Sequence, residues 1–174
     1  MSLVRPVLLS LTVLFLTTAC QTEPGLDKRK FADLNLASQD LKTAIGAGKA
    51  CDAAEGVLQR LSSGAAAIQG KTASKAERDL LSAYSHLLAV SRDGLLLCQS
   101  RNLLSGFPFV PQGHIYVSQE LDAIVERYDL PTEKHLYKPT GKYWKSISTD
   151  SISVVWESAE AEIRHIENMV KYSE

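Results

Sequence analysis

Apolar residues recur at helical spacing in several separate stretches of the chain, and this periodicity constrains the fold more than any other feature. The clearest stretch lies near the C-terminal end, in a predicted helix from about residue 149 or 150 to residue 171. Either Thr149 or Asp150 is a suitable N-cap. The members of its apolar stripe are Ile152, Val155, Trp156, Ala159, Ile163, Ile166 and Val170. A helix with one such stripe packs it against other elements.

Three earlier stretches carry the same spacing of three and four residues. The first covers residues 31–45 and is followed by Gly46 and Gly48, which are typical of the end of a helix. The second begins near residues 51–52. Its predicted inward-facing side chains are Ala54, Val57, Leu58 and Leu61. The third is the longest and covers residues 74–102.

Local signals mark the start of the third helix and the position of a shorter one. Ser74 and Glu77 have the spacing of a capping box, in which both side chains accept hydrogen bonds from N–H groups of the first turn. A short helix is predicted over residues 118–128. No segment of useful length shows the two-residue period of a strand. The predicted fold class is therefore all-α, an antiparallel bundle of four main helices plus one short helix.

A long connector rich in aromatic residues and proline, residues 103–147, separates the third and last main helices. Pro108 and Pro111 exclude a helix around them, because proline lacks an N–H and pushes the preceding residue toward extended geometry. Residues 131–147 are predicted to be mostly loop, with a turn at Pro139-Thr140-Gly141.

The N-terminal segment indicates export. Arg5 is the only charge before an apolar run over residues 7–16, and small residues follow it up to Cys20. The run is shorter than the about 20 apolar residues that a membrane-spanning helix needs. It is typical of a signal peptide, so residues 1–19 are expected to be removed.

The end of this segment, Thr17-Thr18-Ala19-Cys20, resembles the lipobox of bacterial lipoproteins. The resemblance implies that the thiol of Cys20 is acylated, that Cys20 becomes the first residue of the mature chain, and that the lipid is its contact with a membrane. Thr17 stands where the family most often has leucine. The alternative is ordinary secretory cleavage after Ala19, which would leave Cys20 as a free thiol. Because Gln21 and not aspartate follows the cysteine, the resemblance implies the outer membrane, with the protein facing the periplasm.

Removal of 19 of the 174 residues would leave 155, a length that suits one domain. Residues 20–30 are predicted to be a lipidated, flexible tether, and residues 31–174 a single helical domain. Without Arg5 the formal charge of the chain is −2. That balance does not suggest nucleic acid or an anionic surface as a partner, since either would call for a basic cluster.

Cys51 and Cys98 are the two cysteines that remain if Cys20 is lipidated. In an oxidising compartment such a pair usually forms a bridge. If the second and third helices are antiparallel neighbours, the start of one lies near the end of the other. The sequence therefore predicts a Cys51–Cys98 disulfide. The alternative, a reactive thiol or metal pair, lacks the C-x-x-C spacing that would support it.

The sequence carries little that points to catalysis. It has no G-x-S-x-G elbow after a strand, no C-x-x-C-H haem motif and no glycine loop that would cradle phosphate. Glu162 and His165 share one helix face at a spacing that occurs in di-iron proteins, but those proteins use two such helices and further carboxylates. We therefore predict no enzyme activity, no cofactor and no metal, with Glu162 and His165 as the only metal candidate.

The connector supplies the remaining candidate site. Its aromatic side chains either cap the bundle as additional core or form a recognition surface, since aromatic residues on a rigidly held loop provide large contact area. The residues of this candidate interaction surface are Phe107, Phe109, Tyr116, Tyr143 and Trp144.

Two functions follow from these alternatives. The first is an envelope-anchored protein-binding or scaffold module, which resembles, in architecture only, small helical lipoproteins that escort or brace envelope machines. The second is a carrier of a small ligand or metal with a pocket between bundle and connector. An enclosed cavity lined by Tyr84, Phe107, Trp144 or Trp156 would favour the carrier. A filled interior with an exposed aromatic patch would favour a protein partner.

Overall fold

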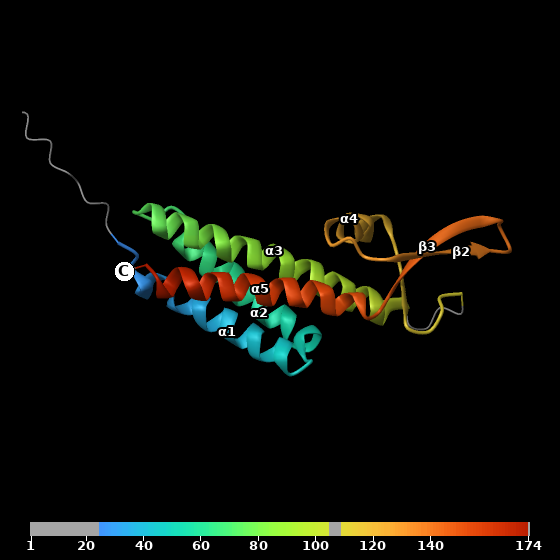
Figure 1. Ribbon diagram of the computed structural model, residues 1–174, viewed down its shortest axis with the longest axis horizontal. Helices are drawn as coiled ribbons and strands as arrows, with labels where there is room; N and C mark the ends of the chain where they lie inside the picture. Colours follow the sequence, from blue (N-terminus) through green and yellow to red (C-terminus); the bar gives the residue numbers. More distant parts are fainter. Residues whose placement is uncertain (1–24, 105–108, 174) are drawn as a thin grey trace, which may run out of the picture.

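The computed structural model describes residues 25–104 and 109–173. Four long helices form an elongated bundle (Figure 1): α1 (Ala32–Gly46), α2 (Ala50–Ile68), α3 (Lys75–Leu104) and α5 (Ser151–Lys171). Along the ring α1, α2, α3, α5, each helix contacts the next, and α5 contacts α1. The predicted bundle of four main helices is confirmed. The signal segment, Cys20 and Phe107 lie outside the described residues.

The predicted apolar stripes form the core of this bundle. Leu41 on α1, Leu61 on α2, Leu87 on α3 and Ile163 on α5 are all fully buried. Because these residues recur every three or four positions, each helix buries one face and leaves the other to solvent. Within the described part of the chain, no helix is both long enough and apolar enough to cross a membrane.

Both the backbone N–H and the side chain of Glu77 take part in capping the start of α3. Ser74 Oγ accepts a hydrogen bond from the Glu77 N–H at 3.1 Å, as the capping box predicts. The Glu77 carboxylate accepts from the Ala73 N–H at 2.6 Å, one residue earlier than the capping box predicts. It also accepts a hydrogen bond from Lys30 Nζ at 2.8 Å. The Lys30 and Ala73 hydrogen bonds lower the pKa of Glu77 to about 2.

The tether is shorter than predicted, because residues before residue 31 fold and contact Glu77. Residues that the sequence analysis placed in the tether form η1 (Lys28–Phe31), a 3-10 helix capped by the Asp27 side chain. Lys30 is paired with the buried Glu77 carboxylate, and Phe31 is itself buried. The folded domain therefore begins several residues before residue 31.

The connector contains a small β-sheet, so the all-α prediction is wrong in this part of the chain. The strands are β1 (His114–Tyr116), β2 (Thr132–Tyr137) and β3 (Lys142–Ser148), arranged antiparallel in the order β1-β3-β2. The short helix α4 (Gln119–Arg127) matches its prediction and buries Leu121, Ile124 and Val125. Ile115 and Ile147, partners across β1 and β3, are fully buried.

β2 escaped prediction because its side chains do not alternate between core and solvent. Every residue of β2 except His135 is exposed, so β2 has no apolar face for the two-residue period to reveal. β1 has only three residues. The predicted turn at Pro139-Thr140-Gly141 is confirmed, since the Thr140 and Gly141 N–H groups both donate to the Tyr137 carbonyl. Gly141 has φ +67, which glycine adopts without strain.

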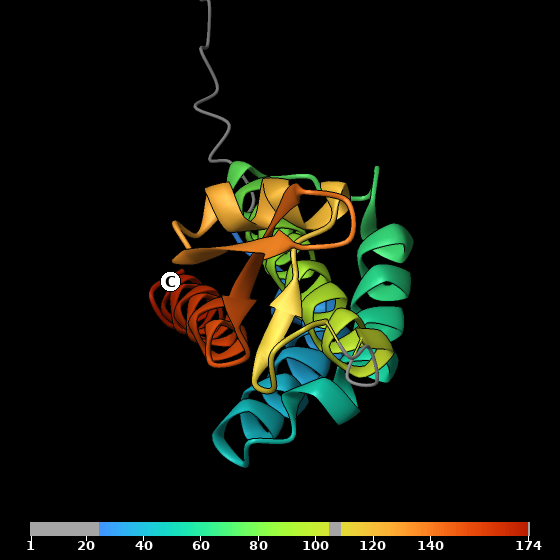
Figure 2. The same ribbon diagram turned by 90° about the vertical axis from the view of Figure 1, so that its right-hand side faces the viewer.

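The sheet and α4 lie together at one end of the bundle, where α3 ends and α5 begins (Figure 1). The hairpin formed by β2, the turn and β3, residues 132–148, extends beyond the helices. The first described residues and the C-terminal end lie at the opposite end of the molecule. Figure 2 views the molecule from the sheet end, with the helices receding behind the strands.

Candidate functional site

Most of the predicted aromatic surface is brought together on the sheet. The ring of Trp144 lies 5.9 Å from that of Phe109 and 5.7 Å from that of Tyr116, measured between ring centroids. Tyr137, which the sequence analysis did not select, lies 5.9 Å from Phe109. These four rings line an open hollow of about 390 Å³, which we call the aromatic groove. Its other wall residues are Thr140, Lys142 and Tyr143. Phe107 lies outside the described residues.

Strand register explains why these side chains meet. His135 is opposite Trp144, and Tyr137 is opposite Lys142. Since successive side chains on a strand point to opposite faces, all four belong to one face of the sheet. Tyr116 on β1 is opposite Ser146, two residues from Trp144, and so shares that face. The aromatic groove is thus assembled from all three strands.

The rim of the groove and the hairpin tip are solvent-exposed. Tyr143 is 73% exposed, Leu136 50%, Phe109 42% and Tyr137 40%. Leu136 and Tyr143 are opposite one another across the hairpin, and Tyr143, which lies between Lys142 and Trp144, forms part of the rim of the groove. Large apolar side chains that gather on one projecting element, and not singly over the surface, are typical of a contact site.

A polar cluster lies beside the rings on the same face. The ring of His135 stacks on Trp144 at 4.3 Å, and its Nε2 lies 2.7 Å from Ser146 Oγ. Glu133 lies 3.4 Å from His114 Nε2 and 3.9 Å from His135 Nε2. A nucleophilic triad requires the carboxylate on the imidazole nitrogen that does not face the serine. Here the carboxylate and the serine both approach Nε2, and Ser146 is fully buried.

The hairpin gathers a basic cluster that the overall charge of the chain conceals. It carries one carboxylate and four lysines, Lys134, Lys138, Lys142 and Lys145, and so has a formal charge of +3. The whole chain has a formal charge of −1, so the residues outside the hairpin together have −4. All four lysines are exposed. Lys145 pairs with Asp122 on α4 at 2.7 Å, which raises the pKa of Lys145. Within the described part of the chain the other three have no ion-pair partner.

Polar contacts fix α4 and hence the sheet to the bundle. Asp93 on α3, which is largely buried, accepts hydrogen bonds from Arg127 and from the Tyr128 hydroxyl, the latter at 3.0 Å. Burial, together with this hydrogen bond to Asp93, raises the pKa of Tyr128 to about 12. α4, which the Asp122–Lys145 ion pair joins to β3, is therefore held against α3.

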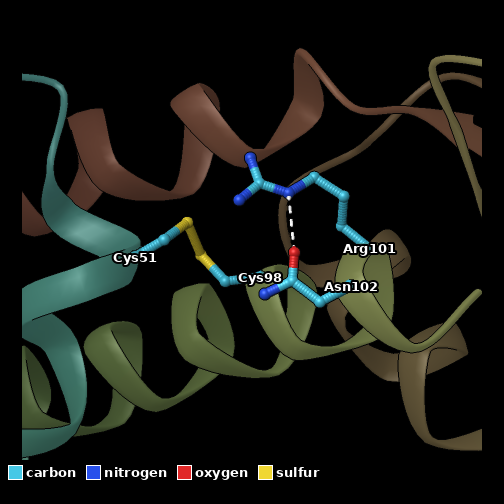
Figure 3. Close-up of a disulfide and its surroundings, with 4 residues drawn as sticks. All are labelled: Cys51, Cys98, Arg101 and Asn102. Atoms are coloured by element: carbon cyan, nitrogen blue, oxygen red, sulfur yellow. Dashed lines mark hydrogen bonds between the residues drawn. A yellow bond between two sulfur atoms is a disulfide. The ribbon is translucent and has the colours of Figure 1, made fainter. Parts of the chain in front are cut away.

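The predicted disulfide is present. Cys51 at the start of α2 and Cys98 near the end of α3 are bonded, with their Cα atoms 5.7 Å apart (Figure 3). On the next turn of α3, Arg101 Nε donates to Asn102 Oδ1 at 3.5 Å. The bond joins the two helices close to the sheet end of α3.

The metal candidate, Glu162 and His165, lies on α5 alone. Glu162 and His165 on α5 line an open surface hollow together with His86 on α3. No group of three or more histidine, cysteine, aspartate or glutamate residues in the described part of the chain could hold a metal ion.

Tyr137, His135 and the lysines were not predicted as site residues. The turn at residues 139–141 was itself a signal for a hairpin, because the tyrosine and tryptophan residues on either side of it favour strands. Comparisons with protein-family models, with curated protein sequences and with solved structures find no match to this chain. Its function is therefore argued from the site itself.

Proposed function

We propose that this chain is the precursor of an envelope lipoprotein and that its mature domain binds a partner protein through the aromatic groove. The anchor rests on the sequence of residues 1–20. The binding role rests on one observation, an aromatic groove with an exposed rim on a hairpin that projects from the bundle. Interfaces with protein partners are enriched in aromatic side chains of this kind.

The position of the groove suits an anchored adaptor. The hairpin and the first described residues lie at opposite ends of the bundle (Figure 1). α3 alone has 30 residues, a length of about 45 Å. A domain held by lipid at its N-terminal end would present the groove away from the membrane that carries it.

The interior favours a protein partner over a carried small ligand. Tyr84 is 1% exposed and packs on Phe31, with ring centroids 6.2 Å apart. Trp156 is 5% exposed and packs against Gly94. Tyr84 and Trp156, two of the aromatic side chains that could have lined an interior cavity, are thus used as core, and the hollow beside Trp144 is open to solvent. We propose a non-catalytic role, which the burial of Ser146 also supports.

The anchor is tested by the substitution Cys20→Ser. The variant should remain uncleaved and should leave the detergent phase in a partitioning experiment, because acyl chains hold a protein at a membrane by about 0.8 kcal/mol per buried methylene. Detergent partitioning equal to that of the wild type would reject lipidation.

The binding role is tested with a photo-crosslinking residue at Tyr143 in intact cells. The same residue at Glu55, which is exposed on α2, is the control position. We expect one defined protein crosslinked from position 143 and not from position 55. Tyr143→Ser should weaken binding of that protein about tenfold. Tyr172→Ser removes a tyrosine of the same 73% exposure at the other end of the bundle and should have no effect. Equal crosslinking from both positions would contradict the proposal.

A further inference from the structure

We propose that β2 binds an acidic, extended segment of the partner as an additional strand of the sheet. This inference rests on the proposed function, since it names the chemistry of the partner. The strand order β1-β3-β2 places β2 at an edge, and in the described part of the chain β2 pairs with β3 alone. An edge strand presents backbone N–H and C=O groups that another extended segment can pair with.

The register makes this edge basic. Lys134 on β2 is directly opposite Lys145 on β3, and both side chains are exposed. Like charges in opposite positions of a sheet destabilise it. Asp122 compensates Lys145 at 2.7 Å. Lys134 has no ion-pair partner within the described residues, so a carboxylate from an added strand would compensate the remaining charge.

The carboxylate of β2 does not repel an acidic segment from the lysine side of this edge. Glu133 lies on the opposite face, within 4 Å of His114 and His135. Lys138, which follows β2 directly, adds a second exposed lysine at the end where the added strand would reach the turn. The edge thus presents lysines on one side and keeps its carboxylate on the other.

The other face selects apolar side chains. Tyr137 on β2 is part of the aromatic groove. A strand added beside β2 would place every second side chain on the lysine face and the intervening ones on the groove face. The segment that fits alternates carboxylates with apolar residues. A second copy of this chain fits poorly, because antiparallel pairing of two β2 strands would bring lysines together.

The test uses three fluorescein-labelled eight-residue peptides that repeat Glu-Val, Ser-Val or Lys-Val, with the purified protein in detergent. Fluorescence anisotropy should show the Glu-Val peptide bound about tenfold more tightly than the Ser-Val peptide at low salt. This preference should fall as salt is added. Amide hydrogen exchange should slow in β2 when the Glu-Val peptide is added, because strand addition hydrogen-bonds the free edge.

The paired variants are K134E/K138E and K71E/K75E, which change the charge equally, the second at exposed positions in the loop before α3 and at its first residue. The first should abolish the preference for Glu-Val and the second should retain it. Equal binding of all three peptides, or slowed exchange outside β2, overturns the inference. Binding to anionic lipid vesicles without binding to any peptide also overturns it. So does slower amide exchange in β2 that depends on protein concentration in the absence of peptide, since this would indicate pairing between copies of the chain. A protein crosslinked from position 143 that still binds K134E/K138E would leave the proposed function standing and reject the acidic strand alone.

Discussion

The indole ring of Trp156 on α5 lies against Gly94 on α3, so that a Cβ atom placed at Gly94 would be 2.8 Å from two ring atoms. This contact lets α3 and α5 approach closely while a large aromatic side chain remains between them. Both residues are buried. The packing of the bundle therefore depends on the absence of a side chain at Gly94.

We predict that Gly94→Ala destabilises the protein. Alanine favours a helix over glycine, but the added methyl group would overpack the contact with Trp156 at a cost of about 1–3 kcal/mol. Gly56→Ala on α2 is the matched control, because no atom lies within 4 Å of a Cβ at that position. Urea unfolding should show the free energy of unfolding reduced for Gly94→Ala and raised by about 0.5–1 kcal/mol for Gly56→Ala. Equal effects at both positions would contradict the contact.

Removal of the disulfide should reduce stability substantially. Cys51 and Cys98 are 47 residues apart, and a bond that closes a loop of this length stabilises by about 4 kcal/mol in the chain-entropy model. The double variant Cys51→Ala/Cys98→Ala should unfold at lower urea than the oxidised wild type. The denatured, unreduced wild type should contain no free thiol from these two residues. Finding both thiols free would disprove the bond.

Stability should depend on pH through Glu77. The pKa of its carboxyl is about 2 in the folded protein and 4.5 when unperturbed. Between these values the unfolded chain binds more protons than the folded one, so stability rises with pH in this range. The contribution of the charged carboxylate is complete above pH 4.5 and is lost as the pH falls through about 2.

The variant Glu77→Gln isolates this effect. At neutral pH it should lose about 1–3 kcal/mol, because hydrogen bonds to a charged group contribute in that range. Its unfolding free energy should also change less than that of the wild type between pH 5 and about 2. Glu55→Gln, at an exposed position on α2, should stay within about 0.5 kcal/mol of the wild type at every pH. An acid dependence identical in wild type and Glu77→Gln would exclude Glu77 as its source.

The attachment of α4 is tested at Asp93. Asp93→Asn weakens the hydrogen bonds from Arg127 and Tyr128 at a largely buried position, and we expect a loss of about 1–3 kcal/mol. The pKa of Tyr128, which is about 12, should fall when it is followed by ultraviolet titration, since one cause of its elevation is removed. Asp122→Asn breaks a surface ion pair with Lys145 and should cost at most about 1 kcal/mol. A Tyr128 pKa unchanged in Asp93→Asn would contradict the assignment.

Elements whose signal is local were predictable. The apolar stripes that contain Leu87 and Ile163 follow from helical geometry, because burial of one helix face repeats every three or four residues. The Pro139-Thr140-Gly141 turn is likewise a property of its own residues. The Cys51–Cys98 bond could be predicted because an antiparallel helix pair restricts which ends meet.

What only the tertiary structure decided is the site. β2 is exposed on both faces, so no apolar alternation distinguishes it from a loop, and it becomes a strand by pairing with β3. That pairing places Lys134 opposite Lys145 and Trp144 beside His135. Both juxtapositions depend on that pairing, because cross-strand neighbours are set by register and by the turn between the strands. The sequence by itself determined the helical bundle and its cross-link, whereas the aromatic groove and its basic edge arise from contacts between strands.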